Sequence, residues 1–261
     1  MSAGRVVTRF DEHGARGRVA RLTIAREAKL NALDPETIAA LAAAARALHD
    51  DETLRAVVVT GAGERAFIGG ADIATMAKLD ADGGQAFITA LHAAIAAVRA
   101  IPVPVIARVN GYCLGAGLEV AAGCDLRVAS TRAMFGMPEV RVGMPSVIEA
   151  ALLPRLIGMG RTAELVLLGE NVDAEKALAI GLVEKVVPPE RLDATVDAWI
   201  EAILAAGPQA VRLQKALMRD WERLPLDEAI KAGIVSFRTS VAGGEPRRML
   251  AEFTARRRRA D

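Results

Sequence analysis

The first two thirds of the chain alternate between short apolar runs and longer stretches in which apolar residues recur at helical spacing. Short apolar runs bounded by turn residues are typical of buried strands, and the Ala-rich stretch from Pro35 to Asp50 has the spacing of a helix. Asp34 is its predicted N-cap. A further helix is predicted to end near Arg99. The predicted strands lie at Val6–Phe10, Val19–Ile24, Ala56–Thr60 and Val105–Val109. Such strand–helix alternation predicts an α/β fold.

The pattern becomes mainly helical from about Leu192. The predicted helices lie at Val196–Ala206, Gln209–Arg223 and Leu226–Ala242. The change follows Val187-Pro188-Pro189, so the chain divides into an α/β core over residues 1–191 and a helical part over 192–261. The basic run Arg256–Arg259 at the end is interpreted as a frayed, solvated tail.

Composition excludes several classes of function. Apolar residues make up 52% of the 261 residues, aromatic residues only 3%, and the net charge is +1. A protein with this balance lacks both the general attraction to polyanions and the aromatic stacking surfaces of nucleic-acid binders. The three histidines have no metal-ligand spacing, so no metal site is predicted. Cys113 and Cys124 are interpreted as small core residues of a reduced protein.

The chain also carries no membrane or export signal that we can identify. No run of about 18 apolar residues free of charge occurs, and the N-terminus lacks the apolar segment of a secretory signal. A cytoplasmic protein without membrane contact is therefore predicted.

Two acids beside a Gly-rich turn are the strongest indication of chemistry. The segment NGYCLGAGLE places Gly115-Ala116-Gly117 directly before an apolar helical pattern that contains Glu119. Backbone N–H groups at a helix start favour an oxygen that becomes negative during a reaction. The second acid, Glu139, follows Pro138 and lies 139 − 119 = 20 residues further on. This combination predicts proton transfer next to an activated carbonyl.

A second Gly-rich turn occurs in AFIGGADI, after the predicted strand Ala56–Thr60. Two such turns could direct two N–H donors at one oxygen, which is the geometry of an oxyanion hole. The neighbours of Glu119 are almost all apolar, and burial among them would raise the pKa of its carboxyl.

These segments, in this order, resemble the enoyl-CoA hydratase/isomerase (crotonase) superfamily over nearly the whole chain, from Lys29–Leu33 to Phe253. The resemblance implies a spiral of strand–strand–helix turns followed by a helical region that forms a homotrimer, or a hexamer of two trimers. It also implies a coenzyme A (CoA) thioester as substrate, with no separate cofactor, and a role in fatty-acid β-oxidation.

The resemblance also assigns roles to single residues. Glu119 matches the acid that activates water, and Glu139 matches the acid that exchanges a proton with the substrate α-carbon. Gly69 and Ala116 match the backbone donors of the oxyanion hole. The positions implied for substrate and CoA binding are Lys29, Ala66, Gly70, Ala71, Asp72, Ile73, Phe253 and Arg256.

We therefore predict an enoyl-CoA hydratase, a hydro-lyase that adds water reversibly to a 2-enoyl-CoA and gives a 3-hydroxyacyl-CoA. One alternative is an enoyl-CoA isomerase, for which a single acid at Glu139 suffices. Another is a protein of this fold that binds RNA or a protein partner. A strand followed by G-x-G-x-x-A at residues 57–66 is similar to a dinucleotide-binding motif, but Gly69-Gly70 interrupts the helix that this motif requires.

The segment after Glu139 departs from the family pattern. Many hydratases have a PGAGG-like run here, whereas this chain has Ser146-Val147-Ile148 after Pro145. Bulky residues thus replace small ones where the acyl pocket is shaped. Glu149 adds a third carboxylate, interpreted either as a helix-surface acid or as a contact to a polar acyl group.

Overall fold

The structure is a computed structural model that describes the backbone of residues 5–260 and the side chains through residue 255. Its strands are β1 (Val6–Glu12), β2 (Arg18–Ile24), β3 (Leu54–Gly61), β4 (Ala66–Ile68), β5 (Val105–Val109), β6 (Tyr112–Leu114), β7 (Leu126–Ser130), β8 (Met134–Gly136), β9 (Val172–Asp173) and β10 (Lys185–Val187). Its helices are α1 (Pro35–Ala47), α2 (Ile73–Met76), α3 (Ala81–Ala100), α4 (Ala116–Gly123), α5 (Leu153–Leu168), α6 (Ala174–Ala179), α7 (Leu192–Ala205), α8 (Pro208–Trp221), α9 (Leu226–Ala242) and α10 (Glu245–Ala260).

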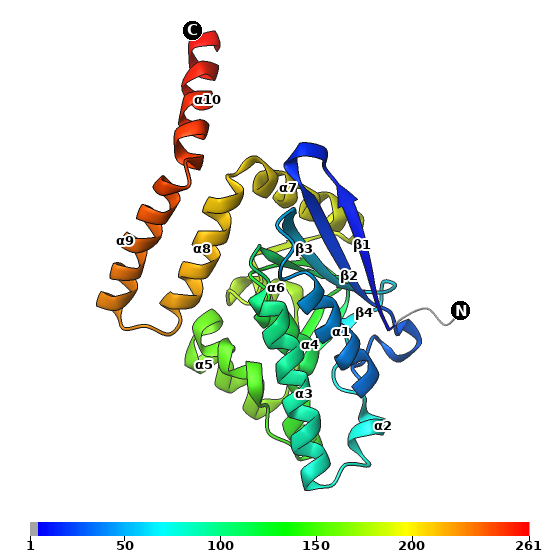
Figure 1. Cartoon of the computed structure of the whole chain (residues 1–261). Coiled ribbons are helices and arrows are strands. Elements are labelled where there is room, and N and C mark those ends of the chain that lie inside the picture. Colours follow the sequence, from blue (N-terminus) through cyan, green and yellow to red (C-terminus); the bar gives the residue numbers. More distant parts are fainter. Residues whose placement is uncertain (1–4, 261) are drawn as a thin grey trace.

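A six-stranded sheet in the order β1-β2-β3-β5-β7-β10 forms the centre of the fold (Figure 1). Strands β1 and β2 form an antiparallel hairpin, and the other neighbours pair in parallel. Alternate residues of β3 belong to different cores: Val57 and Val59 face the larger core, whereas Ala56 and Val58 face α7. Burial on both faces explains why the parallel strands read as continuous apolar runs.

The chain winds as a spiral of strand–strand–helix turns. Strands β3, β5 and β7 are successive neighbours in the large sheet, while the strands that follow them, β4, β6 and β8, are successive neighbours in a four-stranded sheet. The pairs β4–β6 and β6–β8 are parallel. Each turn of the spiral therefore repeats the direction of the one before, and the predicted α/β spiral is confirmed.

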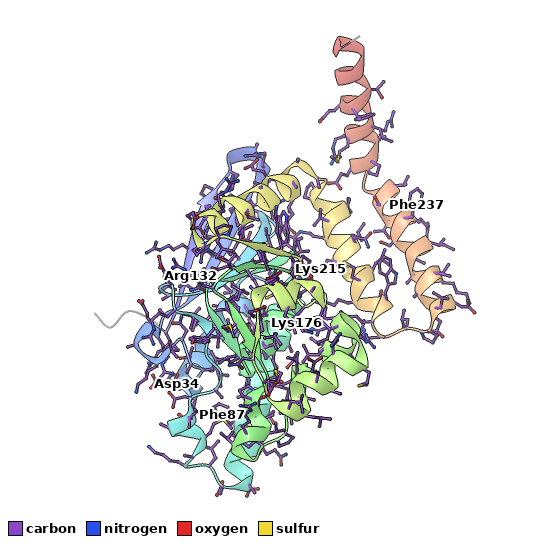
Figure 2. All side chains as sticks on the ribbon, turned by 180° about the vertical axis from the view of Figure 1, so that it is seen from behind. Asp34, Phe87, Arg132, Lys176, Lys215 and Phe237 are labelled. Carbon is purple, nitrogen blue, oxygen red and sulfur yellow. The ribbon has the colours of Figure 1, made fainter. Side chains whose placement is uncertain are left out.

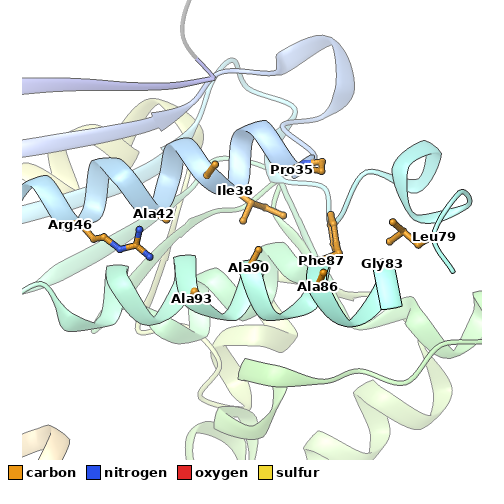
Figure 3. Close-up of a pocket in the computed structure, with 11 residues that line it drawn as sticks. Pro35, Ile38, Ala42, Arg46, Leu79, Gly83, Ala86, Phe87, Ala90 and Ala93 are labelled. Carbon is orange, nitrogen blue, oxygen red and sulfur yellow. The ribbon is translucent and has the colours of Figure 1, made fainter. Parts of the chain in front are cut away.

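Helices α1 and α3 pack side by side over the larger core through small residues (Figure 3). Asp34 caps α1 by accepting a hydrogen bond from the Thr37 N–H, at 2.8 Å, as predicted. Because many contact residues are alanines, the two helices leave an apolar cavity of about 510 Å³ between them, lined by residues such as Ile38, Ala42, Phe87 and Ala90.

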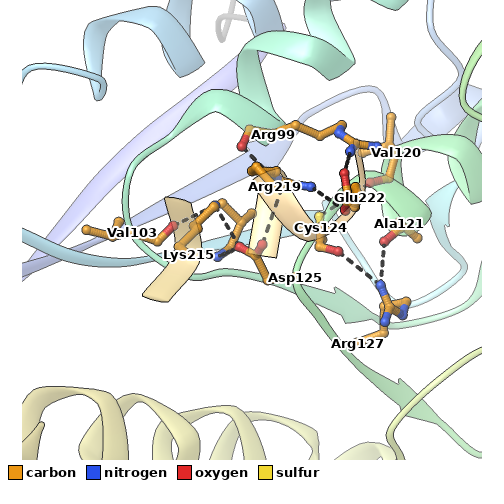
Figure 4. A network of polar contacts seen from close by, with 11 residues as sticks. Arg99, Val103, Val120, Ala121, Cys124, Asp125, Arg127, Lys215, Arg219 and Glu222 are labelled. Carbon is orange, nitrogen blue, oxygen red and sulfur yellow. Dashed lines mark hydrogen bonds and ion pairs between the residues drawn. The ribbon is translucent and has the colours of Figure 1, made fainter. Parts of the chain in front are cut away.

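The C-terminal helices differ in how they contact the core. Leu192, Val196 and Ile200 on α7 pack against the large sheet. Helix α8 is attached through Lys215, a buried side chain that points back into the body of the molecule (Figure 2) and bonds to Asp125 Oδ2 at 2.7 Å. Asp125 also pairs with Arg219, and Figure 4 shows this network. The predicted boundary between residues 191 and 192 stays a prediction.

Helix α10 corrects the interpretation of the chain end as a frayed tail, because its backbone is helical to Ala260. Its first residue, Glu245, is buried and accepts hydrogen bonds from the N–H groups of Gln209 and Ala210, at 3.1 and 2.8 Å. A carboxylate at the start of α8 satisfies N–H groups that have no partner within that helix. Beyond this anchor, α10 extends away from the rest of the chain (Figure 1).

Candidate active site

The spiral brings both Gly-rich turns and both acids to one edge of the small sheet. Strands β4, β6 and β8 run parallel, so their carboxyl ends lie at the same edge. Residues 69–71 follow β4, residues 115–119 follow β6, and Glu139 follows β8. A crevice at the carboxyl ends of parallel strands is a common place for ligand binding.

Two glycines allow this convergence. A Cβ atom added to Gly117 would collide with the carbonyl oxygen of Ile68, so glycine lets α4 approach the first turn. A Cβ atom at Gly115 would collide with Glu139 Oε1. Gly115 also has a φ of +50°, a conformation that glycine adopts readily. The carboxyl of Glu139 therefore lies against the N-terminal turn of the helix that carries Glu119.

Glu119 is held inside the molecule, with only 5% of its surface exposed. Its Oε1 accepts a hydrogen bond from the Ala150 N–H at 3.1 Å. Burial is the main cause that raises the pKa of Glu119 to about 8, as its apolar neighbours predict. The hydrogen bond from Ala150 acts in the opposite direction, and the negative charges of Glu139 and Glu149 raise the pKa further.

Glu139 lies in the short 3-10 helix Pro138–Val142 and is partly buried. Its Oε2 accepts a hydrogen bond from the Ser146 hydroxyl at 2.9 Å. The sequence indicated Ser146 only as a departure from the family pattern, not as a partner of Glu139. This bond orients one carboxylate oxygen, while the other lies against Gly115.

The structure corrects the predicted donor in the first turn. The Gly69 N–H is already donated to the Leu30 carbonyl at 2.8 Å. Leu33 pairs with Ala71 in an isolated parallel bridge. The Leu33 N–H donates to the Gly70 carbonyl, and the Leu33 carbonyl accepts from the Asp72 N–H. In such a parallel bridge the backbone N–H and C=O of the residue between these two partners, here Ala71, point away from the Leu33 strand. Within residues 5–260 the Ala71 N–H has no hydrogen-bond acceptor, so Ala71 replaces Gly69 as the candidate donor.

Ala116 fits the second donor position. It is the first residue of α4, where the N–H groups have no acceptor within the helix. The preceding Gly115 N–H bonds to the Gly136 carbonyl at 2.9 Å, which fixes the turn to the end of β8.

The residues predicted for CoA binding differ in their surroundings. Lys29 is exposed and ends a short 3-10 helix just before Leu30, beside the first turn. Gly70 is buried beside the carbonyl of Leu114. Ile73 is 78% exposed at the start of α2. Ala66 is buried, and its carbonyl accepts bonds from Asn31 and Asn110.

Asp72 is engaged within the fold. It caps α2 by accepting from the Thr75 N–H at 3.0 Å and pairs with Arg26 at 3.1 Å. The Thr75 hydrogen bond, with the Arg26 guanidinium, lowers the pKa of Asp72. Its carboxylate therefore has structural partners already.

The last two predicted CoA contacts lie on α10. Phe253 is 59% exposed there, on a helix that extends away from α4, the helix that carries Glu119 (Figure 1). The Arg256 side chain lies outside the described residues. Within one chain, α10 is therefore not brought to the candidate active site.

Among the described residues, no group of three or more His, Cys, Asp and Glu side chains could hold a metal ion. Cys113 and Cys124 are buried and unbridged. No helix in the described part of the chain is long and apolar enough to cross a membrane.

The spiral fold, with two acids and two Gly-rich turns at one strand edge, is that of the crotonase class of proteins. A sequence model of the enoyl-CoA hydratase/isomerase family matches residues 14–259. The chain is 38% identical, over 82% of each chain, to a short-chain enoyl-CoA hydratase from Clostridium acetobutylicum. It is 35% identical to a crotonyl-CoA hydratase from Syntrophomonas wolfei, over 92% of this chain and 93% of the relative.

Solved structures agree with these relatives. The crystal structure of an enoyl-CoA hydratase from Bacillus anthracis superposes with a TM-score of 0.85 at 30% identity, covering 90% of this chain and 91% of that one. The chain belongs to the enoyl-CoA hydratase/isomerase family, whose members act on acyl-CoA thioesters.

Proposed function

We propose that the protein is an enoyl-CoA hydratase that adds water reversibly across the double bond of a 2-enoyl-CoA. The observation that carries the proposal is the convergence of buried Glu119 and partly buried Glu139 at the strand edge where the Ala71 and Ala116 N–H groups lie. Two hydratases among the relatives support the same reaction class.

The reaction follows from these positions. The Ala71 and Ala116 N–H groups hold the thioester oxygen as it gains negative charge. Donors that are already in position stabilise this charge in the transition state, and they therefore lower the activation barrier. Ionised Glu119 takes a proton from water while the hydroxyl oxygen bonds to C3 of the enoyl chain. Protonated Glu139 gives its proton to C2. One water is consumed, and the two carboxyls exchange protonation states and reset through solvent.

The test is a panel of purified 2-enoyl-CoA thioesters, followed by the loss of absorbance of the conjugated double bond. We expect saturable hydration of at least one short-chain thioester. The isomerase alternative is tested in the same panel with 3-enoyl-CoA substrates. Absence of hydration across the panel, with the protein folded and binding CoA thioesters, would contradict the proposal.

The raised pKa of Glu119 predicts how the hydration rate depends on pH. Its carboxyl is mostly protonated at pH 7 and ionises as the pH rises through about 8. The reaction needs one proton on this pair of carboxyls, which Glu139 gives to C2, so kcat/KM is expected to fall by about 10-fold per pH unit once the pH exceeds about 8. The free energy of unfolding is expected to fall as the pH rises from about 4.5 to about 8, because in this window the folded protein still holds the Glu119 proton and the unfolded chain has lost it. A kcat/KM profile that stays flat above a pH of about 8 would contradict this assignment.

We also propose that the protein assembles as a homotrimer, alone or paired into a hexamer. Ile230, Ile234 and Phe237 recur at helical spacing on α9 and are 55%, 67% and 74% exposed in the single chain. Apolar surfaces of this kind mark protein–protein contacts. Light scattering of the wild type is expected to give the mass of three or six chains.

A double variant, Ile234→Asp with Phe237→Asp, is expected to lower the assembled mass, because it places two charges in the contact. Lys231→Glu, a charge change at an exposed position of the same helix, serves as the matched control and leaves the mass unchanged. A monomeric wild type would contradict the proposed assembly.

A further inference from the structure

The carboxylate of Glu149 lies next to the candidate active site and is not used by the proposed reaction. It belongs to the short 3-10 helix Ile148–Leu152, directly before Ala150, whose N–H holds Glu119. Its side chain is 6% exposed, and Oε1 lies 2.8 Å from His92 Nδ1 on α3. The charge of Glu149 contributes to the raised pKa of Glu119, so the two carboxyls are electrostatic neighbours.

The second oxygen of Glu149 has no partner. Among the side chains of residues 5–255, Glu149 Oε2 is the only carboxylate oxygen that is buried without a hydrogen bond. A buried acceptor left unpaired costs free energy that a donor from a ligand or water would recover. An unpaired charged oxygen beside a catalytic-type acid therefore indicates a position where a donor is expected.

The backbone directly before Glu149 is strained. Ile148 has a φ of +41°, a left-handed conformation that a β-branched residue rarely adopts. Strain of this kind persists where the surrounding structure enforces it, and it concentrates at functional sites. The strained residue immediately precedes Glu149 and is part of the same short helix.

Glu149, His92, Ile148 and Leu152 line a pocket of about 710 Å³ that reaches from this short helix to α8. Its three arginines have acid partners of their own. Arg99 pairs with Glu222 at 2.7 Å, Arg219 with the same acid at 3.1 Å, and Arg223 with Asp220 at 3.0 Å. The first two pairs belong to the network of Figure 4. Of the side chains that line this pocket, Glu149 is thus the one that has a buried polar atom without a partner, its Oε2.

We propose that Glu149, oriented by His92, recognises a hydroxyl group on the acyl chain of the CoA thioester. The inference rests on the proposed function, since it places the acyl chain beyond Glu119. A hydroxyl donates one hydrogen bond to Oε2 without adding charge. A carboxylate on the chain would be repelled by Glu149, and an ammonium group would face the cationic side chains of the same pocket. The apolar residues Ile148 and Leu152 pack along the rest of the chain.

The test measures binding rather than turnover. Isothermal titration calorimetry compares the terminally hydroxylated butanoyl-, pentanoyl- and hexanoyl-CoA with their unsubstituted counterparts on the wild-type protein. A hydrogen bond to a charged group predicts about 10- to 100-fold tighter binding of the hydroxylated chain at the length that reaches Glu149. Equal or weaker binding of the hydroxylated chains at all three lengths would overturn the inference.

Variants separate recognition by Glu149 from a general effect of the pocket. Glu149→Leu is expected to abolish the preference for the hydroxyl while the unsubstituted chain still binds. Glu149→Gln, a smaller change, is expected to reduce the preference to a few-fold, since an amide oxygen is an uncharged acceptor. Glu222→Gln is the matched control, because Glu222 lines the same pocket but already pairs with arginines, and it keeps the preference.

A full preference in both Glu149 variants would overturn the inference. The proposed function fails in a different way, through absence of enoyl-CoA hydration in the panel described above. Hydration of crotonyl-CoA without any hydroxyl preference removes only the role of Glu149.

Discussion

Glu119→Gln is expected to reduce hydration by about 10²–10⁴-fold, because the amide cannot take the proton from water. The substitution keeps the shape of the side chain. Its amide oxygen can accept the same hydrogen bond from the Ala150 N–H that Glu119 Oε1 accepts. Loss of activity would therefore report the missing base rather than a displaced segment. The measurement is the initial rate on the best thioester of the panel.

Circular dichroism and the assembled mass of Glu119→Gln should match the wild type. Glu190→Gln, at an exposed position of a surface turn, is the control for removal of one carboxylate and is expected to keep full activity. A Glu119→Gln enzyme within a few-fold of the wild-type rate would show that Glu119 is not the base.

Glu139→Gln is expected to stop two reactions: water addition and exchange of the substrate α-proton with deuterated solvent. If Glu139 is the acid that exchanges a proton with C2, both rates should fall by about 10²–10⁴-fold. Ser146 can still donate its hydroxyl to the amide oxygen of the variant, so the segment keeps its anchor. Mass spectrometry of the thioester in heavy water reads both rates.

The same experiment distinguishes the hydratase from the isomerase. The wild type is expected to hydrate a 2-enoyl-CoA faster than it moves a 3-enoyl bond into conjugation, because Glu119 supplies a base for the attacking water in addition to the proton donor Glu139. A wild type that isomerises efficiently but incorporates no solvent oxygen would overturn the hydratase proposal. The fold and the membership of the family would be unaffected.

The main elements were predictable because each is long enough for its apolar spacing to be read. The strand Val105–Val109 and the helix Leu226–Ala242 have the predicted bounds. Strands β4, β6 and β8 were not predicted, since each has only three residues and shows no period. These short strands align the turns that form the site, so the apolar spacing alone did not show how the two predicted turns are held side by side.

The choice of donor shows why the site was only partly predictable. The sequence located the first Gly-rich turn, but which N–H is free depends on pairing with Leu30 and Leu33, about 40 residues earlier in the chain. The contact between His92 and Glu149 joins residues 57 apart on separate elements. No local pattern encodes either pairing, because both arise from the way the spiral stacks its turns.

The hydrogen bond from the Ala150 N–H to Glu119 has a consequence for protein engineering. Ile148 and Glu149, which line the neighbouring pocket, belong to the same short helix as this N–H. A substitution that reshapes the pocket can also move a donor, or remove a charge, that contributes to the shifted pKa of Glu119. Libraries at positions 148 and 149 should therefore be screened at several pH values, so that a changed substrate preference is not confused with a displaced pH optimum.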